Sequence, residues 1–241
     1  MKVLIIIPAY NEEESIERVV TRLCEQYPQY DYLVVNDCSR DRTPEILRAR
    51  GYAHLNLPVN LGIGGAVQSG YLYATQNGYD VAVQMDGDGQ HDPAYLDALL
   101  APIEAGEADM VIGSRFIKRE GFQTSRMRRM GAGLLRAVIR LCCGVKSTDP
   151  TSGFRATNAA LTAFYANEYA QDYPEPEAIV TAARNGFRIC DVPVVMEERQ
   201  GGVSSINMKK SLYYMIKVSL ALILCRIRTK KKKPQAKKEE N

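Results

Sequence analysis

A regular alternation of short apolar, β-branched runs with longer helical patterns limits the fold of this chain more than any other feature. The runs predict strands at 3–7, 32–35, 53–57, 81–85, 110–112 and 188–195. The stretches between them predict helices at 12–26, 44–50, 64–77, 93–104, 131–143 and 177–185. Strands that alternate with helices form a mostly parallel sheet with helices on both faces, so the sequence predicts an α/β fold.

Polar clusters stand at the carboxyl ends of four of the predicted strands. They occupy residues 8–12, 36–41, 86–90 and 113–115. In open parallel sheets, ligands bind beyond the carboxyl ends of the strands. The four clusters are therefore expected to meet at one rim and to form a binding site.

The sharpest of these clusters is Asp86-Gly87-Asp88, a D-x-D directly after an apolar run. Two carboxylates this close repel each other unless a cation lies between them or one is protonated. Mg²⁺ takes oxygen ligands and commonly binds one or two carboxylates together with substrate phosphates. The motif predicts a divalent cation that holds a diphosphate, and the alternative is a solvated turn, because Asp and Gly are favoured turn residues.

The charge distribution excludes one class of partner. Residues 206–241 contain 11 Lys or Arg and two Glu, whereas residues 1–205 carry a net charge of −6. A nucleic-acid-binding domain would carry its basic surface on the folded body, so no nucleic-acid partner is expected. A basic tail on an acidic body instead predicts contact with an anionic surface. The six cysteines include no C-x-x-C pair, which argues against a structural zinc site and a disulfide framework.

Three further segments allow two interpretations each. The glycine-rich stretch 60–70 lacks the G-K-[ST] of a phosphate-binding loop, and close helix–sheet packing explains it equally well. In the stretch 36–43, Asp41 is expected to cap the following helix and Asp37 to contact a ligand. Residues 118–133 predict a mobile loop that leads into the helix at 131–143. Its Arg126, Arg128 and Arg129 form either a clamp for anionic substrates or a solvated charge run.

Seven stretches in order give the chain a specific resemblance. They are IIIPAYNEEESI, VVNDCSRDRT, NLGIGGAVQSG, QMDGDGQHDP, VIGSRF, STDPTSGFRA and ERQGGVSSI. Together they resemble the inverting family 2 glycosyltransferases of GT-A fold, and within them the polyprenyl-phosphate branch that includes the dolichol-phosphate mannose synthases. The resemblance covers about residues 1–205.

The resemblance implies a role for each matching position. Nucleoside contacts are implied for Pro8, Tyr10, Glu12 and Asp37. Asp86, Asp88 and Gln90 would hold Mg²⁺ or Mn²⁺ and the donor diphosphate. Phosphate binding is implied for Arg115, Arg129 and Arg199, and positions near the acceptor for Asp149 and Glu177. Asp88, Asp149 and Arg199 are the expected catalytic set.

The sequence departs from the family pattern at two places. Asn36-Asp37 stands where paired aspartates are usual, and Asp37 keeps the expected contact. The G-x-S-K ending of the mannose synthases reads Gly202-Val203-Ser204-Ser205, and Ser204 and Ser205 are the expected substrate contacts. The absent lysine leaves a UDP-linked donor as open as a GDP-linked one. The chain has no tryptophan, so it lacks the QxxRW motif of processive synthases, which favours transfer of a single sugar.

The C-terminal part predicts membrane contact. Residues 206–228 form a basic, largely apolar helical pattern interrupted by Lys217, and no stretch reaches about 18 uncharged apolar residues. We expect three parts: a GT-A domain at 1–205, an amphipathic interface helix at 206–228 and a basic, disordered tail at 229–241. A core-packed helix and docking onto a small integral membrane subunit are the alternatives.

The expected activity is metal-dependent, inverting transfer of one sugar to undecaprenyl or dolichyl phosphate by a peripheral enzyme at the cytoplasmic face of the membrane. Transfer to a glycan or glycolipid hydroxyl is the second hypothesis. A non-catalytic nucleotide-sugar-binding subunit is the third.

Overall fold

The computed structural model describes residues 1–118, 126–197 and 208–228, with the backbone alone for 126–130 and 208–214. The strands are β1 (Val3–Ala9), β2 (Asp31–Asn36), β3 (His54–Asn56), β4 (Val81–Gln84), β5 (Met110–Ser114), β6 (Arg155–Asn158) and β7 (Ile189–Pro193). The helices are α1 (Ile16–Gln26), α2 (Thr43–Ala49), α3 (Gly62–Gln76), the 3₁₀ turn η1 (Pro93–Tyr95), α4 (Leu96–Glu104), α5 (Arg126–Cys143), α6 (Ala159–Asn167), α7 (Pro174–Arg184) and α8 (Met208–Arg228).

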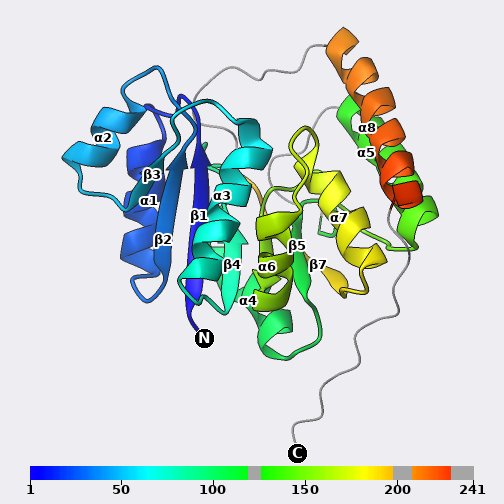
Figure 1. Cartoon of the computed structure of the whole chain (residues 1–241), viewed down its shortest axis with the longest axis horizontal. Helices are drawn as coiled ribbons and strands as arrows, with labels where there is room; N and C mark the ends of the chain where they lie inside the picture. Colours follow the sequence, from blue (N-terminus) through cyan, green and yellow to red (C-terminus); the bar gives the residue numbers. More distant parts are fainter. Residues whose placement is uncertain (119–125, 198–207, 229–241) are drawn as a thin grey trace, which may run out of the picture.

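The strands form one sheet in the order β3-β2-β1-β4-β6-β5-β7 (Figure 1). Every neighbouring pair is parallel except the two that involve β6, which runs antiparallel to β4 and β5. The predicted mostly parallel sheet is confirmed. Because β1, β2, β4 and β5 run in the same direction, their carboxyl ends meet at one rim, as expected.

The sheet separates two apolar layers, and β1 shows why. All its residues are buried, and its side chains alternate between the faces. Leu4 and Ile6 pack in the layer that holds α3 and α6, whereas Ile5 belongs to the layer that holds α1 and α4. In Figure 1, α3, α6 and α7 cover one face of the sheet. A strand covered on both faces reads as a continuous apolar run, and this is how β1 appears in the sequence.

Several elements differ from the sequence-based expectation. The helix expected from residue 12 begins at Ile16, because residues 12–15 form a turn in which the Ile16 N–H donates to the Glu12 carbonyl at 2.9 Å. Neither β6 nor α6 was predicted. The segment of β6, Arg-Ala-Thr-Asn, has no alternation of apolar residues, and its partners lie far away in sequence.

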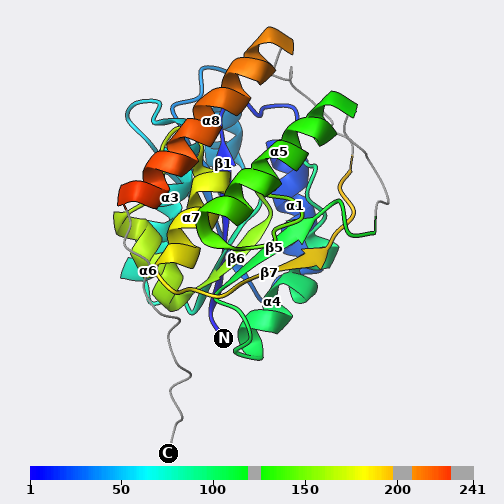
Figure 2. The ribbon, with the colours of Figure 1, turned by 90° about the vertical axis from the view of Figure 1, so that its right-hand side faces the viewer.

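The predicted loop before residue 131 is wrong at 126–130, since α5 begins at Arg126 rather than at residue 131. Arg and Met are good helix formers, so the basic run 126–130 extends the helix instead of interrupting it. Helices α5 and α8 lie side by side (Figure 2). On α8, Val218 and Leu222 are fully buried in the layer shared with α5 and α7.

Candidate active site at the carboxyl rim of the sheet

The D-x-D loop, residues 86–92, follows β4 at the centre of the rim. The Asp88 side chain turns back onto its own loop, where its Oδ1 accepts from the Gln90 N–H at 3.0 Å. Gly89 adopts a φ of 78°, a conformation that glycine tolerates and other residues rarely adopt. Asp86 stays about one-third exposed, so its carboxylate faces the open side of the rim.

His91, which was not among the predicted site residues, holds the backbone of this loop. The Asp86 N–H donates to His91 Nδ1 at 2.9 Å, which places the proton of the neutral ring on Nε2. Nε2 lies 3.7 Å from Asp86 Oδ2. The ring stacks on Phe154, with centroids 4.8 Å apart. The signal that could have revealed it is its place directly after D-x-D-x-Q.

Residues 149–153, here called the Asp149 loop, approach Asp86 closely at Gly153. A Cβ at this position would lie 2.8 Å and 2.9 Å from the two carboxylate oxygens of Asp86. The fully buried Arg155 holds the loop, because its guanidinium donates to the carbonyls of Pro150 at 2.9 Å and Ser152 at 2.6 Å. Only glycine lets the two loops approach this far.

The side chains around Asp86 suit a hard divalent cation. Asp86 and Asp88 offer carboxylate oxygens, and Gln90 adds an amide. The buried Oε1 of Gln84, whose Nε2 donates to Asp86 at 3.3 Å, has no hydrogen-bond partner among the described residues. Within the residues that the structure describes, no group of three or more His, Cys, Asp or Glu side chains forms a complete metal site by itself. Two carboxylates completed by substrate phosphates is the arrangement typical of Mg²⁺.

Arg115 and Asp149, expected separately at phosphate and acceptor, bind each other. Arg115 Nε and Nη2 donate to the two Asp149 oxygens at 2.7 Å and 2.9 Å, and Nη2 also reaches Thr151 Oγ1 at 3.2 Å. Asp149 is fully buried. A carboxylate held by a bidentate arginine is suited to positioning that arginine rather than to abstracting a proton.

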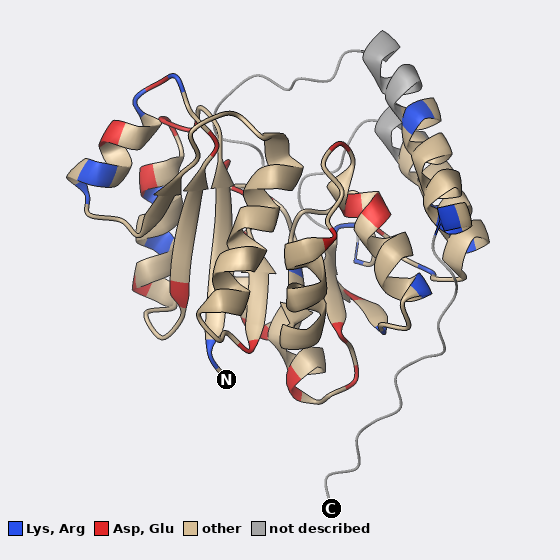
Figure 3. Ribbon diagram, viewed as in Figure 1, with Lys and Arg blue, Asp and Glu red and all other residues tan. Residues whose placement is uncertain are grey.

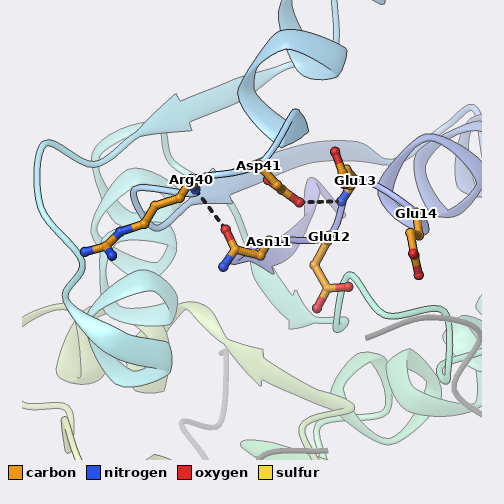
Figure 4. A pocket seen from close by; sticks show the side chains of 6 residues that line it. All are labelled: Asn11, Glu12, Glu13, Glu14, Arg40 and Asp41. Carbon is orange, nitrogen blue, oxygen red and sulfur yellow. Dashed lines mark hydrogen bonds between the residues drawn. The ribbon is translucent and has the colours of Figure 1, made fainter. Parts of the chain in front are cut away.

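A cavity of about 350 Å³ opens at the ends of β1 and β2 (Figure 4). It is lined by Asn11, Glu12, Glu13, Glu14, Arg40 and Asp41. The two loops that form it are tied together, since the Arg40 N–H donates to Asn11 Oδ1 at 2.8 Å and the Glu13 N–H donates to Asp41 Oδ2 at 3.0 Å. The N-cap of α2 is Arg42 rather than the expected Asp41, but Asp41 Oδ1 accepts from the N–H of Thr43, the first residue of the helix, at 3.0 Å.

The other residues expected at the nucleoside differ in exposure. Tyr10 is exposed, whereas Pro8 is buried near the end of β1. Asp37 is also buried, and its Oδ1 accepts from the Leu61 N–H at 2.7 Å. The Asp37 carboxylate therefore anchors the N-terminus of α3, a structural role that its sequence position did not reveal.

Two glutamates of α7 have raised pKa values. Burial raises the pKa of Glu177, an expected acceptor-side residue, and the charge of Asp172 raises it further. Burial is also the main cause that raises the pKa of Glu175; nearby Arg155 acts against this shift, and the charge of Asp86 adds to it. Glu175 was not predicted, although the sequence P-E-P-E placed a second carboxylate beside the expected one.

The remaining expected residues are described partly or not at all. Arg129 lies in the first turns of α5, where only the backbone is described, so its expected loop position is wrong. Arg199, Ser204 and Ser205 lie outside the described residues.

Comparison with known proteins gives the same family as the sequence motifs. The model of the family described as "Glycosyl transferase family 2" matches residues 4–163. An undecaprenyl-phosphate mannosyltransferase of Micrococcus luteus is 37% identical over 221 residues, which cover 86% of this chain and 88% of that protein. A polyprenol monophosphomannose synthase of Mycolicibacterium smegmatis is 31% identical over 231 residues, covering 90% of this chain and 86% of the relative.

Solved structures show the same fold. Glucosyl-3-phosphoglycerate synthase from Mycobacterium tuberculosis, in complex with Mn²⁺, UDP and phosphoglyceric acid, superposes with a TM-score of 0.69 at 24% identity. The match covers 95% of this chain and 79% of that one. The expected α/β fold of GT-A type is confirmed by this likeness.

Proposed function

Since the chain belongs to glycosyltransferase family 2, we propose that it transfers one sugar from a nucleotide-sugar donor to a polyprenyl phosphate, with a divalent cation and with inversion at the anomeric carbon. The observation that carries the proposal is the meeting of the D-x-D loop with the Asp149 loop at the rim, where Gly153 leaves room for the Asp86 carboxylate. Relatives whose names specify polyprenyl-phosphate acceptors support the choice of acceptor.

At the donor end, the cavity at Asn11–Glu14 would take the nucleoside, and Asp86, Asp88 and Gln90 would hold Mg²⁺ or Mn²⁺ against the diphosphate. A divalent cation bound there would neutralise the charge that develops on the leaving diphosphate. His91 fixes the backbone of Asp86, so the carboxylate is oriented before the donor arrives. A preorganised charge of this kind needs no rearrangement during the reaction.

At the acceptor end, Asp149 would orient Arg115 toward the phosphates. A lipid phosphate is already ionised near neutral pH, so it can attack the anomeric carbon without a strong general base. The phosphate oxygen forms the new bond as the bond to the nucleoside diphosphate breaks. Attack from the side opposite the leaving group inverts the configuration. The pairing of Asp149 with Arg115 supports this chemistry, because with a phosphate acceptor Asp149 needs only to position Arg115 and not to take up a proton.

The exposed apolar residues of α5 and α8 suit a lipid acceptor. Leu141 on α5 is 69% exposed and Ile227 on α8 is 73% exposed. The surface is completed by Leu134, Ile216, Leu220, Ile223 and Leu224. The described side chains of α8 carry no acidic group, and their charged residues, Lys217, Arg226 and Arg228, are basic (Figure 3). Exposed apolar residues flanked by basic ones favour binding in the interface of an anionic membrane.

Among the described residues, no helix is long and apolar enough to cross a membrane. From the exposed apolar and basic residues of these two helices, we propose a peripheral enzyme at the cytoplasmic face, with α5 and α8 against the lipid. One side of α8 is buried on the domain and the other is exposed, which supports a helix that packs on the domain and also meets the membrane interface. Docking onto an integral membrane subunit remains the alternative use of this surface.

The identity of the sugar is left open among three classes. Relatives include a mannosyltransferase, an N-acetylglucosaminyltransferase of Methanococcus voltae and a β-glucosyltransferase of Trichomonas vaginalis, each named for a polyprenyl or dolichyl phosphate acceptor. Both UDP- and GDP-linked donors are consistent with the chain.

A hydroxyl acceptor on a glycan or glycolipid is the second candidate, and Glu175 is the observation that favours it. A hydroxyl needs a general base whose pKa lies nearer to neutrality than that of an ordinary carboxylate. Burial raises the pKa of Glu175, and the charge of Asp86 adds to this shift. Complete loss of turnover in Glu175→Gln, with donor binding retained, would favour this candidate.

The test is turnover by the purified chain with radiolabelled GDP-mannose, UDP-glucose and UDP-N-acetylglucosamine, with undecaprenyl phosphate in detergent as the acceptor. We expect one donor to give a mild-acid-labile lipid product whose formation stops with EDTA. The variant Asp88→Asn should lose this activity, whereas Asp80→Asn, at the opposite end of β4, should keep it. Donor binding without any lipid product would contradict the proposal and point to a hydroxyl acceptor or a non-catalytic subunit.

A further inference from the structure

An ion-pair cluster outside the predicted site joins three distant parts of the chain. Arg22 on α1 binds Asp92 Oδ1 through Nη2 at 2.8 Å and Glu197 Oε1 through Nη1 at 2.8 Å. The three side chains are 34%, 21% and 35% exposed, respectively. The hydrogen bond that Arg22 donates to Glu197 and the nearby charge of Asp92 raise the pKa of Arg22, although partial burial opposes this. A single guanidinium thus neutralises two carboxylates that would otherwise repel each other.

The Asp92 end of the cluster fixes the last residue of the D-x-D loop. Asp92 Oδ1 also accepts from the Ala94 N–H at 3.0 Å, which caps η1. The preceding residue, His91, holds the backbone N–H of Asp86. Whatever fixes Asp92 therefore also fixes the imidazole on which the orientation of Asp86 depends.

The Glu197 end fixes the outer edge of the same loop. The Glu197 N–H donates to the Gln90 carbonyl at 2.9 Å, and Gln90 Nε2 donates to the Glu197 carbonyl at 3.4 Å. One residue further, His91 and Met196 form an antiparallel bridge. The D-x-D loop is thereby paired with a short stretch of chain, and the Glu197 side chain attaches that stretch to α1.

We infer that Arg22 is a positioning residue for the cation and diphosphate site, acting on the D-x-D loop through Asp92 and Glu197. This inference rests on the proposed function, and it assigns Arg22 no contact with the donor or the cation. A guanidinium reaches both carboxylates with two separate N–H groups, whereas a lysine presents one point charge. Arg22→Lys should therefore restore only part of what Arg22→Gln loses.

The experiment measures calorimetric binding of UDP and of GDP, each in the presence of Mn²⁺, to the whole chain. For the nucleotide that the wild type binds, we expect Arg22→Gln to weaken binding about three- to tenfold, or about 0.6 to 1.4 kcal/mol. This loss of affinity is smaller than the loss typical for residues that hydrogen-bond directly to metal ligands, because the ion pairs of Arg22 are partly exposed. Glu197→Gln added to Arg22→Gln should weaken binding no further, since both changes remove the same contact.

The matched control is Arg50→Gln, which removes another ion pair of α1, that between Arg50 and Glu17. It should leave nucleotide affinity unchanged. A second readout is amide hydrogen exchange, which should rise at Glu197 and around Gln90 in Arg22→Gln and stay at the wild-type rate in Arg50→Gln. This measurement follows loop positioning without any ligand.

The outcomes separate the inference from the proposed function. If the wild type binds neither nucleotide with Mn²⁺, the proposed donor site is wrong and the inference falls with it. If the wild type binds but Arg22→Gln binds equally well and exchanges at the same rate, the inference alone is overturned.

Discussion

Replacing Gly153 by alanine tests the closest contact of the candidate site. The new methyl group would lie 2.8 Å and 2.9 Å from the Asp86 oxygens and 2.9 Å from Gln84 Nε2. Ordinary contact with a Cβ begins at 3.4 Å, so the Asp86 carboxylate must move by about 0.5 Å or the Asp149 loop must retreat by as much. We expect the carboxylate to move, because the loop is held by the buried Arg155.

The size of the effect follows from the tolerance of cation sites. Metal–ligand distances vary by only about 0.2 Å, so a displacement of about 0.5 Å removes Asp86 as an effective ligand. Mn²⁺ affinity should fall about 10- to 100-fold, which corresponds to about 1.4 to 2.7 kcal/mol. The overpacking should also lower the free energy of unfolding by about 1 to 3 kcal/mol.

The assay is titration of Mn²⁺ in the presence of the nucleoside diphosphate, followed by calorimetry, with denaturant unfolding measured on the same samples. The control is Gly133→Ala in α5, where the added methyl group meets, among the described side chains, only Arg136 Nη2 at 3.7 Å. That variant should bind Mn²⁺ like the wild type and gain about 1 kcal/mol of helix stability. Wild-type Mn²⁺ affinity in folded Gly153→Ala would refute the assignment of Asp86 to the cation site.

Three further predictions concern other parts of the molecule. Asp149→Asn should lower the free energy of unfolding by about 3 kcal/mol, because the guanidinium of Arg115 loses its buried partner; urea unfolding at the wild-type midpoint would contradict this. Burial of Asp109 favours its protonated form, but the hydrogen bonds from Arg188 outweigh it and lower the pKa of Asp109. The stabilising effect of the Asp109 carboxylate is therefore present above the unfolded pKa of about 4 and is lost as the pH falls further. Asp109→Asn should flatten the fall in Tm below about pH 5. An unchanged slope of Tm against pH would refute this prediction. Ile227→Glu should reduce co-sedimentation with phosphatidylglycerol vesicles about tenfold or more. The Tm should not change, because an exposed isoleucine contributes little to the stability of the folded monomer. Unaltered co-sedimentation would reject the lipid-facing role of α8.

The local pattern of the sequence was sufficient for most of the fold. The apolar run of β1 and the alternation that follows it predicted the six parallel strands and the rim at which four polar strand ends meet. These features depend on neighbouring residues, since side-chain periodicity and burial on both faces are visible within a short window. The D-x-D motif also follows from local order, because both aspartates and their glycines belong to one turn.

The sequence alone did not predict the antiparallel strand β6. Its four residues carry no strand signal of their own, and they are extended because the edges of β4 and β5 offer backbone partners on both sides. Strand pairing of this kind is set by the whole sheet and overrides weak local preference.

The pairing of charged groups was likewise decided only by the tertiary structure. The motifs identified Arg115 and Asp149 as site residues. They did not reveal that the two side chains bind each other across 34 positions of sequence. Nor did they show that Arg22 meets Glu197, 175 residues away. A charged side chain can pair with any opposite charge that the fold brings within about 4 Å, and one-dimensional order carries no record of that distance. The sequence determined which chemical groups the rim contains, and the folded chain determined which of them hold one another in place.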